Sequence, residues 1–368
     1  MTSDKKPFNP VRAPETVEDL VYGPQEASDL SIALVEEAQQ VRGQGVQFGI
    51  ARLDEVMNPL RPGELISVYG LPGHHKSSIM NWLSKRALAA IGPETDEVVV
   101  RVTWEQSVEE DTLAWLANDS HLSVTKMVRG TLNEAEWKLI LESSVRRATS
   151  PMWIVGHSQL RSKQRRQARP RMTLTDVALA LEYICEDASD RKLKLNLVVL
   201  DYLQRIRPDP QDGRDRREQV MEMVNRAKDC ALSFGCPVLL GVQSRREVAE
   251  RQNKMPRQDD AQESSNVEQT SDKVITLWYP HKTEQAGSVV QTTRYAPRKD
   301  NGAYSSPQVI SEDWKVGPNL LLVGLPKQKM GATIDAVPVM VDPARSIFSD
   351  MTASEKGGSV GRNLTSRG

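Results

Sequence analysis

A glycine-rich turn joins a short apolar run, residues 65–69, to a segment that begins at Lys76 and continues with helical spacing toward Ala90. The turn reads Gly70-Leu71-Pro72-Gly73-His74-His75-Lys76-Ser77. In a P-loop, such a turn surrounds phosphate oxygens with backbone N–H groups and a helix N-terminus. Lys76 would neutralise charge on the β- and γ-phosphates of ATP, and Ser77 would place its hydroxyl on Mg²⁺. The predicted nucleotide-binding residues are Gly70, Pro72, Gly73, His74, His75, Lys76, Ser77 and Ser78. A glycine-rich turn without a ligand is the alternative.

Three further polar residues each end an apolar run. The run 196–200 ends in Asp201, which is the Walker B pattern, and Asp201 would hold Mg²⁺ through water. Glu105 follows the run 98–103 and could orient and deprotonate an attacking water. Gln243 follows the run 238–242 and could sense the γ-phosphate. Each of these residues could instead be an ordinary strand-end side chain, but together with a P-loop they predict an ATP hydrolase that uses Mg²⁺.

The composition is that of a soluble globular chain. Of its 368 residues 39% are apolar, and 48 basic against 49 acidic side chains give a net charge of −1. A uniformly basic surface is therefore excluded, although a local basic patch is not. The three cysteines cannot build a disulfide framework and have no metal-ligand spacing, which suits a reducing cytoplasm. No apolar run reaches the roughly 18 residues of a membrane span.

The chain is expected to divide into four parts: a disordered tail at 1–25, a helix within 26–45, an ATPase domain at 46–350 and a disordered tail at 351–368. In the ATPase domain, apolar strands alternate with helices, which indicates an α/β fold with a mostly parallel sheet, helices on both faces and an antiparallel C-terminal extension. Strands are predicted at 65–69, 98–103, 152–155, 197–200, 238–242, 274–278, 320–325 and 337–341. Helices are predicted after Lys76, after a capping box of Thr131 and Glu134, from Thr173, and from Arg216 to Phe234.

A basic segment, residues 161–171, interrupts the alternation after the third strand and contains no acidic residue. Its arginines Arg165, Arg166 and Arg169 could contact phosphates of a nucleic acid. A solvated loop is an equally good interpretation.

With these motifs in order, residues 26–351 resemble the DnaB family of hexameric replicative helicases, specifically their RecA-like motor domain. The most specific match is Leu200-Asp201-Tyr202-Leu203-Gln204, which is close to the Walker B signature of the family. Further similar segments are 48–54, 60–65, 103–107, 262–272 and 327–331.

The resemblance implies a ring of six subunits that encircles one DNA strand, with ATP at each interface. The helix within 26–42 resembles the linker helix that packs on the adjacent subunit. Lys327 and Lys329 match the element that reaches into the neighbour's ATP site. Gln262, Glu263 and Ser265 match the DNA-binding loop. No segment resembles the N-terminal helical domain of the family, which usually contacts primase, and a replication-protein partner is therefore left open.

Three departures from the family pattern matter for activity. His75 stands where a P-loop has glycine, Lys329 stands where the family has an arginine finger, and Gln262 and Ser265 stand where the family tends to have Arg and Gly. A lysine keeps the charge of an arginine finger but loses its planar fork. These departures favour slow ATP turnover.

The leading interpretation is an ATP-driven motor on single-stranded DNA in replication. The alternative is an ATP-binding, weakly hydrolysing assembly or recruitment protein in replication, recombination or defence. A RecA-like recombinase or loader is a third possibility.

Overall fold

The computed structural model describes residues 21, 23–40, 46–91, 95–160, 163, 172–187, 192–209, 215–262, 266–296 and 308–351. Within these residues one nine-stranded sheet has the order β11-β10-β9-β6-β1-β5-β4-β2-β3. Strands β6, β1, β5, β4, β2 and β3 are parallel, and β9, β10 and β11 extend the sheet in antiparallel fashion. This topology confirms the predicted mostly parallel sheet with an antiparallel extension. The strands are β1 (Leu65–Gly70), β2 (Glu97–Thr103), β3 (Met152–Val155), β4 (Lys194–Asp201), β5 (Val238–Gln243), β6 (Lys273–Trp278), β9 (Leu320–Gln328), β10 (Ile334–Asp342) and β11 (Ile347–Asp350).

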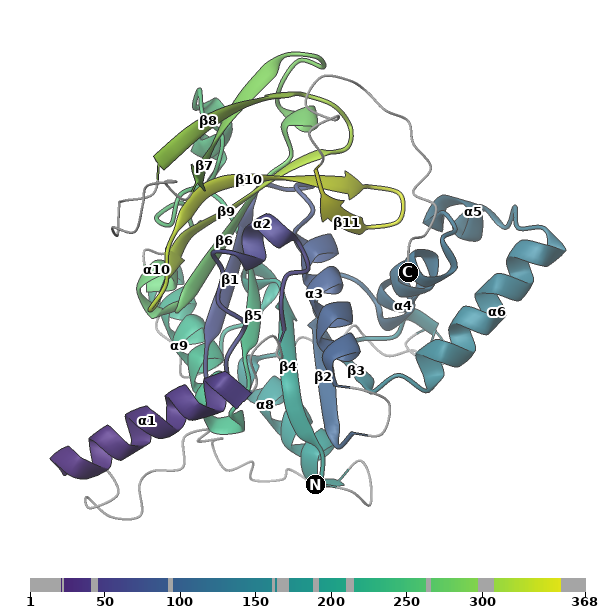
Figure 1. Cartoon of the computed structure of the whole chain (residues 1–368). Helices are drawn as coiled ribbons and strands as arrows, with labels where there is room; N and C mark the ends of the chain where they lie inside the picture. Colours follow the sequence, from purple (N-terminus) through teal and green to yellow (C-terminus); the bar gives the residue numbers. More distant parts are fainter. Residues whose placement is uncertain are drawn as a thin grey trace.

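Helices cover both faces of the parallel strands (Figure 1). On one face, α3 packs with β1, β4 and β5 around a core that includes Ile79 and Leu83. On the other face, α9 packs on β1 and β5 and α8 packs against α9, and their side chains Val224 and Val177 belong to one core. Every residue of β1 is buried, as expected of a central parallel strand that helices cover on both faces. The α-helices are α1 (Pro24–Gln40), α2 (Ala51–Asp54), α3 (Lys76–Ala90), α4 (Val108–Ser120), α5 (Val124–Arg129), α6 (Glu134–Ala148), α8 (Leu174–Glu182), α9 (Arg216–Phe234) and α10 (Asn266–Thr270).

Short turns of other helix types lie between these elements. They are η2 (Tyr183–Asp187), η3 (Leu203–Arg205), η4 (Arg246–Glu250) and η5 (Pro280–Lys282).

Helix capping confirms two predictions and corrects a third. Thr173 caps α8 in a reciprocal capping box, and Gly235 ends α9 in the left-handed conformation. The predicted capping box of Thr131 and Glu134 is wrong: Asn133 is the N-cap of α6, and its partner is Glu136. Because the two pairs are offset by two residues, both fit the capping pattern in sequence, and the backbone at Asn133 decides between them.

A two-stranded antiparallel sheet, β7 (Val289–Ala296) with β8 (Gln308–Lys315), packs against β10 and was not predicted. Its strands carry no continuous apolar run, since polar residues alternate with apolar ones. Trp314 of β8 nevertheless lies in a small separate core with Trp278 and Leu322. The pairing is therefore stabilised by a few large side chains rather than by an apolar strand.

Helix α1 lies apart from the sheet (Figure 1), and its side chains Leu30, Ile32 and Val35 are exposed. The predicted tails at 1–25 and 351–368 lie outside the described residues, apart from residues 21, 23–25 and 351. Among the described helices, none is both long and apolar enough to span a membrane.

Candidate active site

The carboxyl ends of four neighbouring strands bring the predicted site residues to one edge of the sheet. Gly70 at the end of β1 pairs in register with Gln243 at the end of β5. Thr103 at the end of β2 pairs with Asp201 at the end of β4, and Glu105 follows Thr103 by two residues. Ligands of open parallel sheets bind outside this carboxyl edge. The topology thus gathers residues that are far apart in the sequence.

The turn between β1 and α3 has the backbone shape that its glycines suggest. Gly73 has φ of 74° and His75 has φ of 63°, so both lie in the left-handed region. His75 is the residue directly before α3, and it therefore occupies a conformation that glycine adopts without cost and that other L-residues adopt at about 1–2 kcal/mol. Alternating left- and right-handed residues point successive N–H groups inward and make an anion-binding concavity.

Lys76 lies folded back on this turn. Its Nζ donates to the carbonyl oxygens of Gly70 and Leu71, at 2.8 Å and 3.2 Å. Burial lowers the pKa of Lys76 to about 8, and the negative charges of Asp201 and Glu105 oppose that shift. The ammonium has thus lost part of its hydration and is hydrogen-bonded to two neutral carbonyl oxygens. A phosphate anion would stabilise its charge better than these carbonyls do.

Two imidazoles line the same turn and stay neutral at physiological pH. Burial is the main cause that lowers the pKa of His74 and of His75 to about 4, and nearby lysine charges add to it. His74 Nδ1 accepts a hydrogen bond from the backbone N–H of Tyr279, at 3.1 Å. The ring of His75 meets the ring of Tyr279 edge to face, with 4.6 Å between centroids.

Asp201 provides the acidic wall of the site. The residue is 6% exposed, and its Oδ1 has no hydrogen-bond partner among the described residues. Burial raises the pKa of the carboxyl, whereas the charge of Arg101 and a hydrogen bond with Ser77 lower it. No group of three His, Cys, Asp or Glu side chains in the described part of the chain could hold a metal alone. One carboxylate with a free oxygen beside one hydroxyl nevertheless fits Mg²⁺, which takes few protein ligands and completes its shell with water and phosphate.

Glu105 and Gln243 stand on either side of this centre. A carboxylate oxygen of Glu105, Oε1, lies 3.6 Å from Nη2 of Arg205, and both side chains are about half exposed. The backbone N–H of Gln243 donates to the side-chain oxygen of Gln204, at 3.1 Å. The carbonyl of Gln243 accepts from the backbone N–H of Gln262, at 2.9 Å. Gln243 therefore connects the carboxyl edge of the sheet to the start of the predicted DNA-binding loop.

The comparison with known proteins decides the family. The family described as "DnaB-like helicase C terminal domain" matches residues 45–302, which is more than half of the chain. The chain belongs to the DnaB-like helicase C-terminal domain family. It is 25% identical over 276 residues to the replicative DNA helicase DnaB of Mycoplasma genitalium, covering 75% of this chain and 53% of that protein. It is 28% identical over 258 residues to DnaB of Leifsonia xyli subsp. xyli, covering 68% of this chain and 51% of that protein. The chain thus spans about half the length of these curated relatives.

Solved structures agree on the fold. One solved ATPase domain superposes with a TM-score of 0.67 at 16% identity, over 88% of this chain and 98% of that domain. A DnaB-like replicative helicase, solved in a study of its interactions with primase, superposes with a TM-score of 0.65 at 16% identity, over 88% of this chain and 67% of that one. The expected RecA-like architecture is therefore confirmed.

In this DnaB-like domain the two candidate finger lysines lie far from the predicted P-loop of the same chain. The backbone N–H of Lys329 donates to the carbonyl of Asp272, at 2.8 Å, and Asp272 Oδ2 accepts from the N–H of Leu65. Leu65 begins β1, whereas the P-loop follows Gly70 at its other end, about 16 Å away at the usual rise of a strand. Lys327 is held at the same distant edge by the carbonyl of Glu268.

Not all predicted contacts with DNA can be placed. Gln262 lies beside Gln243, to which its backbone is hydrogen-bonded. Glu263 and Ser265 of the loop, and Arg165, Arg166 and Arg169 of the basic segment, lie outside the residues that the structure describes.

Three residues that the sequence did not single out for the site lie beside it. Arg205 contacts Glu105, and it could have been suspected because it follows Asp201 by four residues. Arg101 influences Asp201 from within β2, where a charged residue in an apolar run is the only signal. Lys282 lies against the P-loop after a long return of the chain, and no local pattern indicates it.

Proposed function

We propose that this chain hydrolyses ATP with Mg²⁺ to move along single-stranded DNA, as one subunit of a DnaB-like hexameric ring in DNA replication. The observation that carries the proposal is the convergence of Lys76, Asp201, Glu105 and Gln243 on one edge of the sheet in a member of this family. The four residues come from four different segments of the chain. An ordinary set of strand-end side chains would not be expected to combine a cation, a carboxylate suited to a metal and a second carboxylate.

Each residue has a defined part in the chemistry. The P-loop N–H groups and Lys76 bind the phosphates, while Ser77 and Asp201 hold Mg²⁺. Bound Mg²⁺ would neutralise charge on the β- and γ-phosphate oxygens. Glu105 accepts the proton of the attacking water and orients it, and Gln243 responds to the presence of the γ-phosphate. Glu105 must first leave Arg205, its neighbour at 3.6 Å.

Lys327 and Lys329 act on the ATP site of the neighbouring subunit. Support comes from their position, since roughly a full strand length separates them from the P-loop of the same chain. The Lys329 side chain is 67% exposed, and its Nζ lies 3.8 Å from Oδ1 of Asp272, so it must leave that carboxylate to reach a neighbouring subunit.

Assembly uses two unpartnered apolar surfaces of the same chain. Helix α1 exposes Leu30, Ile32 and Val35, and helix α6 exposes the stripe Trp137, Leu141 and Val145, at spacing i, i+4, i+8. The two helices lie on opposite sides of the molecule (Figure 1), so contact between α1 of one copy and α6 of the next is heterologous and builds a ring or a helix.

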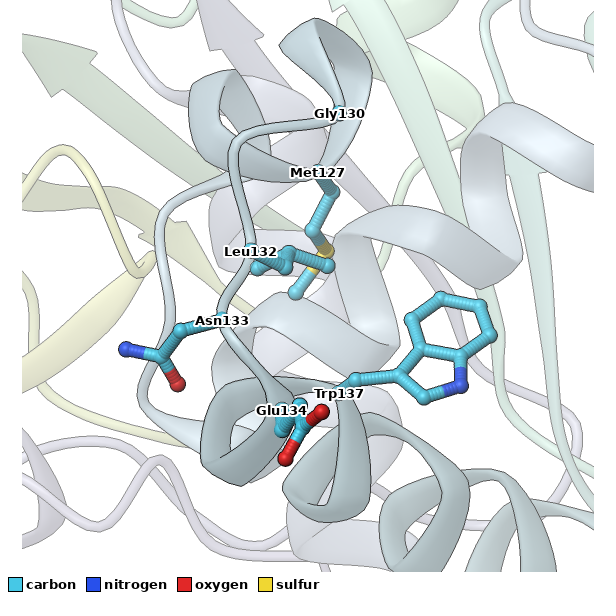
Figure 2. Close-up of a pocket in the computed structure, with 6 residues that line it drawn as sticks. All are labelled: Met127, Gly130, Leu132, Asn133, Glu134 and Trp137. Atoms are coloured by element: carbon cyan, nitrogen blue, oxygen red, sulfur yellow. The ribbon is translucent and has the colours of Figure 1, made fainter.

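A pocket next to the α6 stripe offers room for an apolar side chain of α1. It has a volume of about 340 Å³ and lies at the junction of α5 and α6, with Met127, Leu132 and Trp137 pointing toward it (Figure 2). Its remaining lining residues are Gly130, Asn133 and Glu134.

DNA binding couples to the ATP site through the direct hydrogen bond between Gln243 and Gln262. The loop of Gln262, Glu263 and Ser265, together with the arginines Arg165, Arg166 and Arg169, contacts the phosphate backbone. Binding is then independent of sequence and weakens with salt, because phosphate contacts release counterions.

Phosphate release with and without single-stranded DNA, measured beside strand displacement on a forked duplex, tests the proposal. We expect DNA to stimulate hydrolysis and the fork to open. Glu105→Gln should keep ATP binding but lose roughly 10²–10⁴-fold in turnover. The control Glu55→Gln, an exposed glutamate on another element, should behave as the unmodified protein.

The alternative, an ATP-binding assembly protein that hydrolyses weakly, is favoured by one contact, the pairing of Glu105 with Arg205. That alternative predicts ring formation on ATP without fork opening and without stimulation by DNA. The same experiment therefore separates the two.

A further inference from the structure

The segment Tyr279–Lys282, which follows β6, is fixed directly over the P-loop. The backbone N–H of Tyr279 donates to His74 Nδ1, at 3.1 Å, and its ring packs edge to face on His75. On its other side the Tyr279 hydroxyl donates to the carbonyl of Pro318, at 2.7 Å. Both histidines of the P-loop are thus used to hold one foreign segment, and that segment is anchored independently to the rest of the fold.

Lys282 extends from this segment across Gly73. A Cβ built on Gly73 would overlap the Lys282 ammonium and would lie 3.1 Å from its Cε. The side chain therefore passes directly beside Gly73, in space that only a glycine leaves open. No carboxylate of the described residues forms an ion pair with Lys282.

The charge at the turn is consequently larger than Lys76 alone provides. The Lys282 ammonium lies beside Gly73, and its positive charge adds to the burial that lowers the pKa of both His74 and His75. Two ammonium groups, neutral imidazoles and the N-terminus of the 15-residue helix α3 surround the loop. The nearest acids, Asp201 and Glu105, act on Lys76.

We propose that Lys282 is a second phosphate-binding residue of this nucleotide site, supplied by the same chain, and that it favours a nucleoside triphosphate over a diphosphate. The inference rests on the proposed function. Lys76 Nζ lies on the carbonyls of Gly70 and Leu71, whereas Lys282 lies over the exposed part of the loop at Gly73. The terminal phosphate of a triphosphate, if it reaches this exposed part of the loop, is bound by a second cation. A diphosphate lacks that phosphate and gains less binding free energy from Lys282.

The proposal assigns a role to His75. A glycine would be less strained at φ of 63°, but it would not pack against Tyr279. His75 is therefore a positioning residue that acts through Tyr279 on Lys282. An additional cation in the same chain also compensates for the planar fork that Lys329 lacks.

Equilibrium titration of the full chain with fluorescent ATP and ADP analogues, in the presence of Mg²⁺, tests the inference. We expect Lys282→Ala to weaken ATP about 10-fold, since a hydrogen bond to a charged group is lost, and to weaken ADP by less than about 3-fold. Lys282→Arg should restore the preference for ATP. Lys194→Ala, an exposed lysine at the opposite edge of the sheet, is the matched control and should change neither affinity.

The positioning role has its own readout. His75→Gly should reproduce the selective loss of ATP affinity, and in the Lys282→Ala background it should have no further effect on the ATP-to-ADP ratio. An unchanged ratio in Lys282→Ala overturns the inference even if the protein binds ATP, and the proposed function then stands. Absence of nucleotide binding by the unmodified protein overturns both.

Discussion

Asp111→Ala is predicted to be among the most destabilising single substitutions on the face of the sheet that α3 covers. Asp111 on α4 is fully buried and accepts from Arg101 on β2, which is 1% exposed. Nε of Arg101 lies 3.1 Å from Oδ1 and 3.2 Å from Oδ2, and Nη2 lies 2.6 Å from Oδ1. The other polar contact of the guanidinium is Ser84 Oγ, at 3.3 Å.

The expected cost follows from what remains after the substitution. Alanine would leave a buried guanidinium whose remaining hydrogen bond is to the neutral hydroxyl of Ser84, with the charge of Asp201 acting on it without a direct contact. Breaking a buried ion pair in this way costs about 3–5 kcal/mol in the free energy of unfolding. Replacing both partners, as Arg101→Met with Asp111→Leu, should come within about 1 kcal/mol of the unmodified protein or exceed it, because both desolvation penalties vanish. The pair therefore stabilises the fold little as a whole, although each partner depends strongly on the other.

Urea unfolding at fixed protein concentration, followed by tryptophan fluorescence, measures these differences. Trp115 on α4 is 7% exposed and reports on this region. Asp119→Ala is the matched control: Asp119 pairs with Arg146 at 2.7 Å, but the Arg146 side chain is 53% exposed, so the loss should stay below about 1 kcal/mol. Equal losses for Asp111→Ala and Asp119→Ala would refute the reasoning, as would a double variant that is less stable than either single one.

Three further outcomes are expected. The affinity for ATP should be constant below about pH 8 and fall up to about 10-fold per pH unit above it, because the free protein then loses the proton of Lys76, whose pKa is about 8. Lys76→Arg should give an affinity that does not change with pH in the same titration, because arginine stays charged. Thermal stability should decrease as pH falls from about 6.5 to 4, because His74 has a pKa of about 4 in the folded protein and the unfolded chain takes up the proton first. His74→Asn keeps an acceptor for the N–H of Tyr279 and should remove this pH-dependent loss, which amounts to up to about 1.4 kcal/mol per pH unit. Equal slopes of stability against pH in the two proteins would contradict the prediction. Deleting residues 1–42 should reduce the oligomer toward monomer or dimer in light scattering, because the exposed face of α1 is removed, and an unchanged oligomer would exclude α1 from assembly.

The sequence by itself determined the parts of the fold that follow from local chemistry. Apolar runs placed β1 and β4 within a few residues, since a parallel strand that is covered on both faces is mostly apolar. The glycine-rich turn between a strand and a helix predicted a P-loop, and His75, which stands where that pattern has glycine, adopts the left-handed conformation in the structure. The same signals were sufficient for the family, which the profile over residues 45–302 then established.

Local patterns were insufficient where two readings fitted equally or where no apolar run existed. The capping pair at the start of α6 was misplaced by two residues, because Thr131 and Asn133 are both good caps. The hairpin of β7 and β8 was missed because its strands alternate between polar and apolar residues, and its stability comes from Trp314 packing on distant elements.

Only the tertiary structure decided which charges meet. Three contacts depend on the order of the strands and the path of the loops: Arg101 with Asp111, Glu105 with Arg205, and Lys282 with Gly73. Sequence spacing determines neighbours along one helix or strand, where the geometry repeats. Between elements, the distance between two side chains depends on packing and topology, and for that reason the position of Lys282 beside Gly73 became visible only in the folded chain.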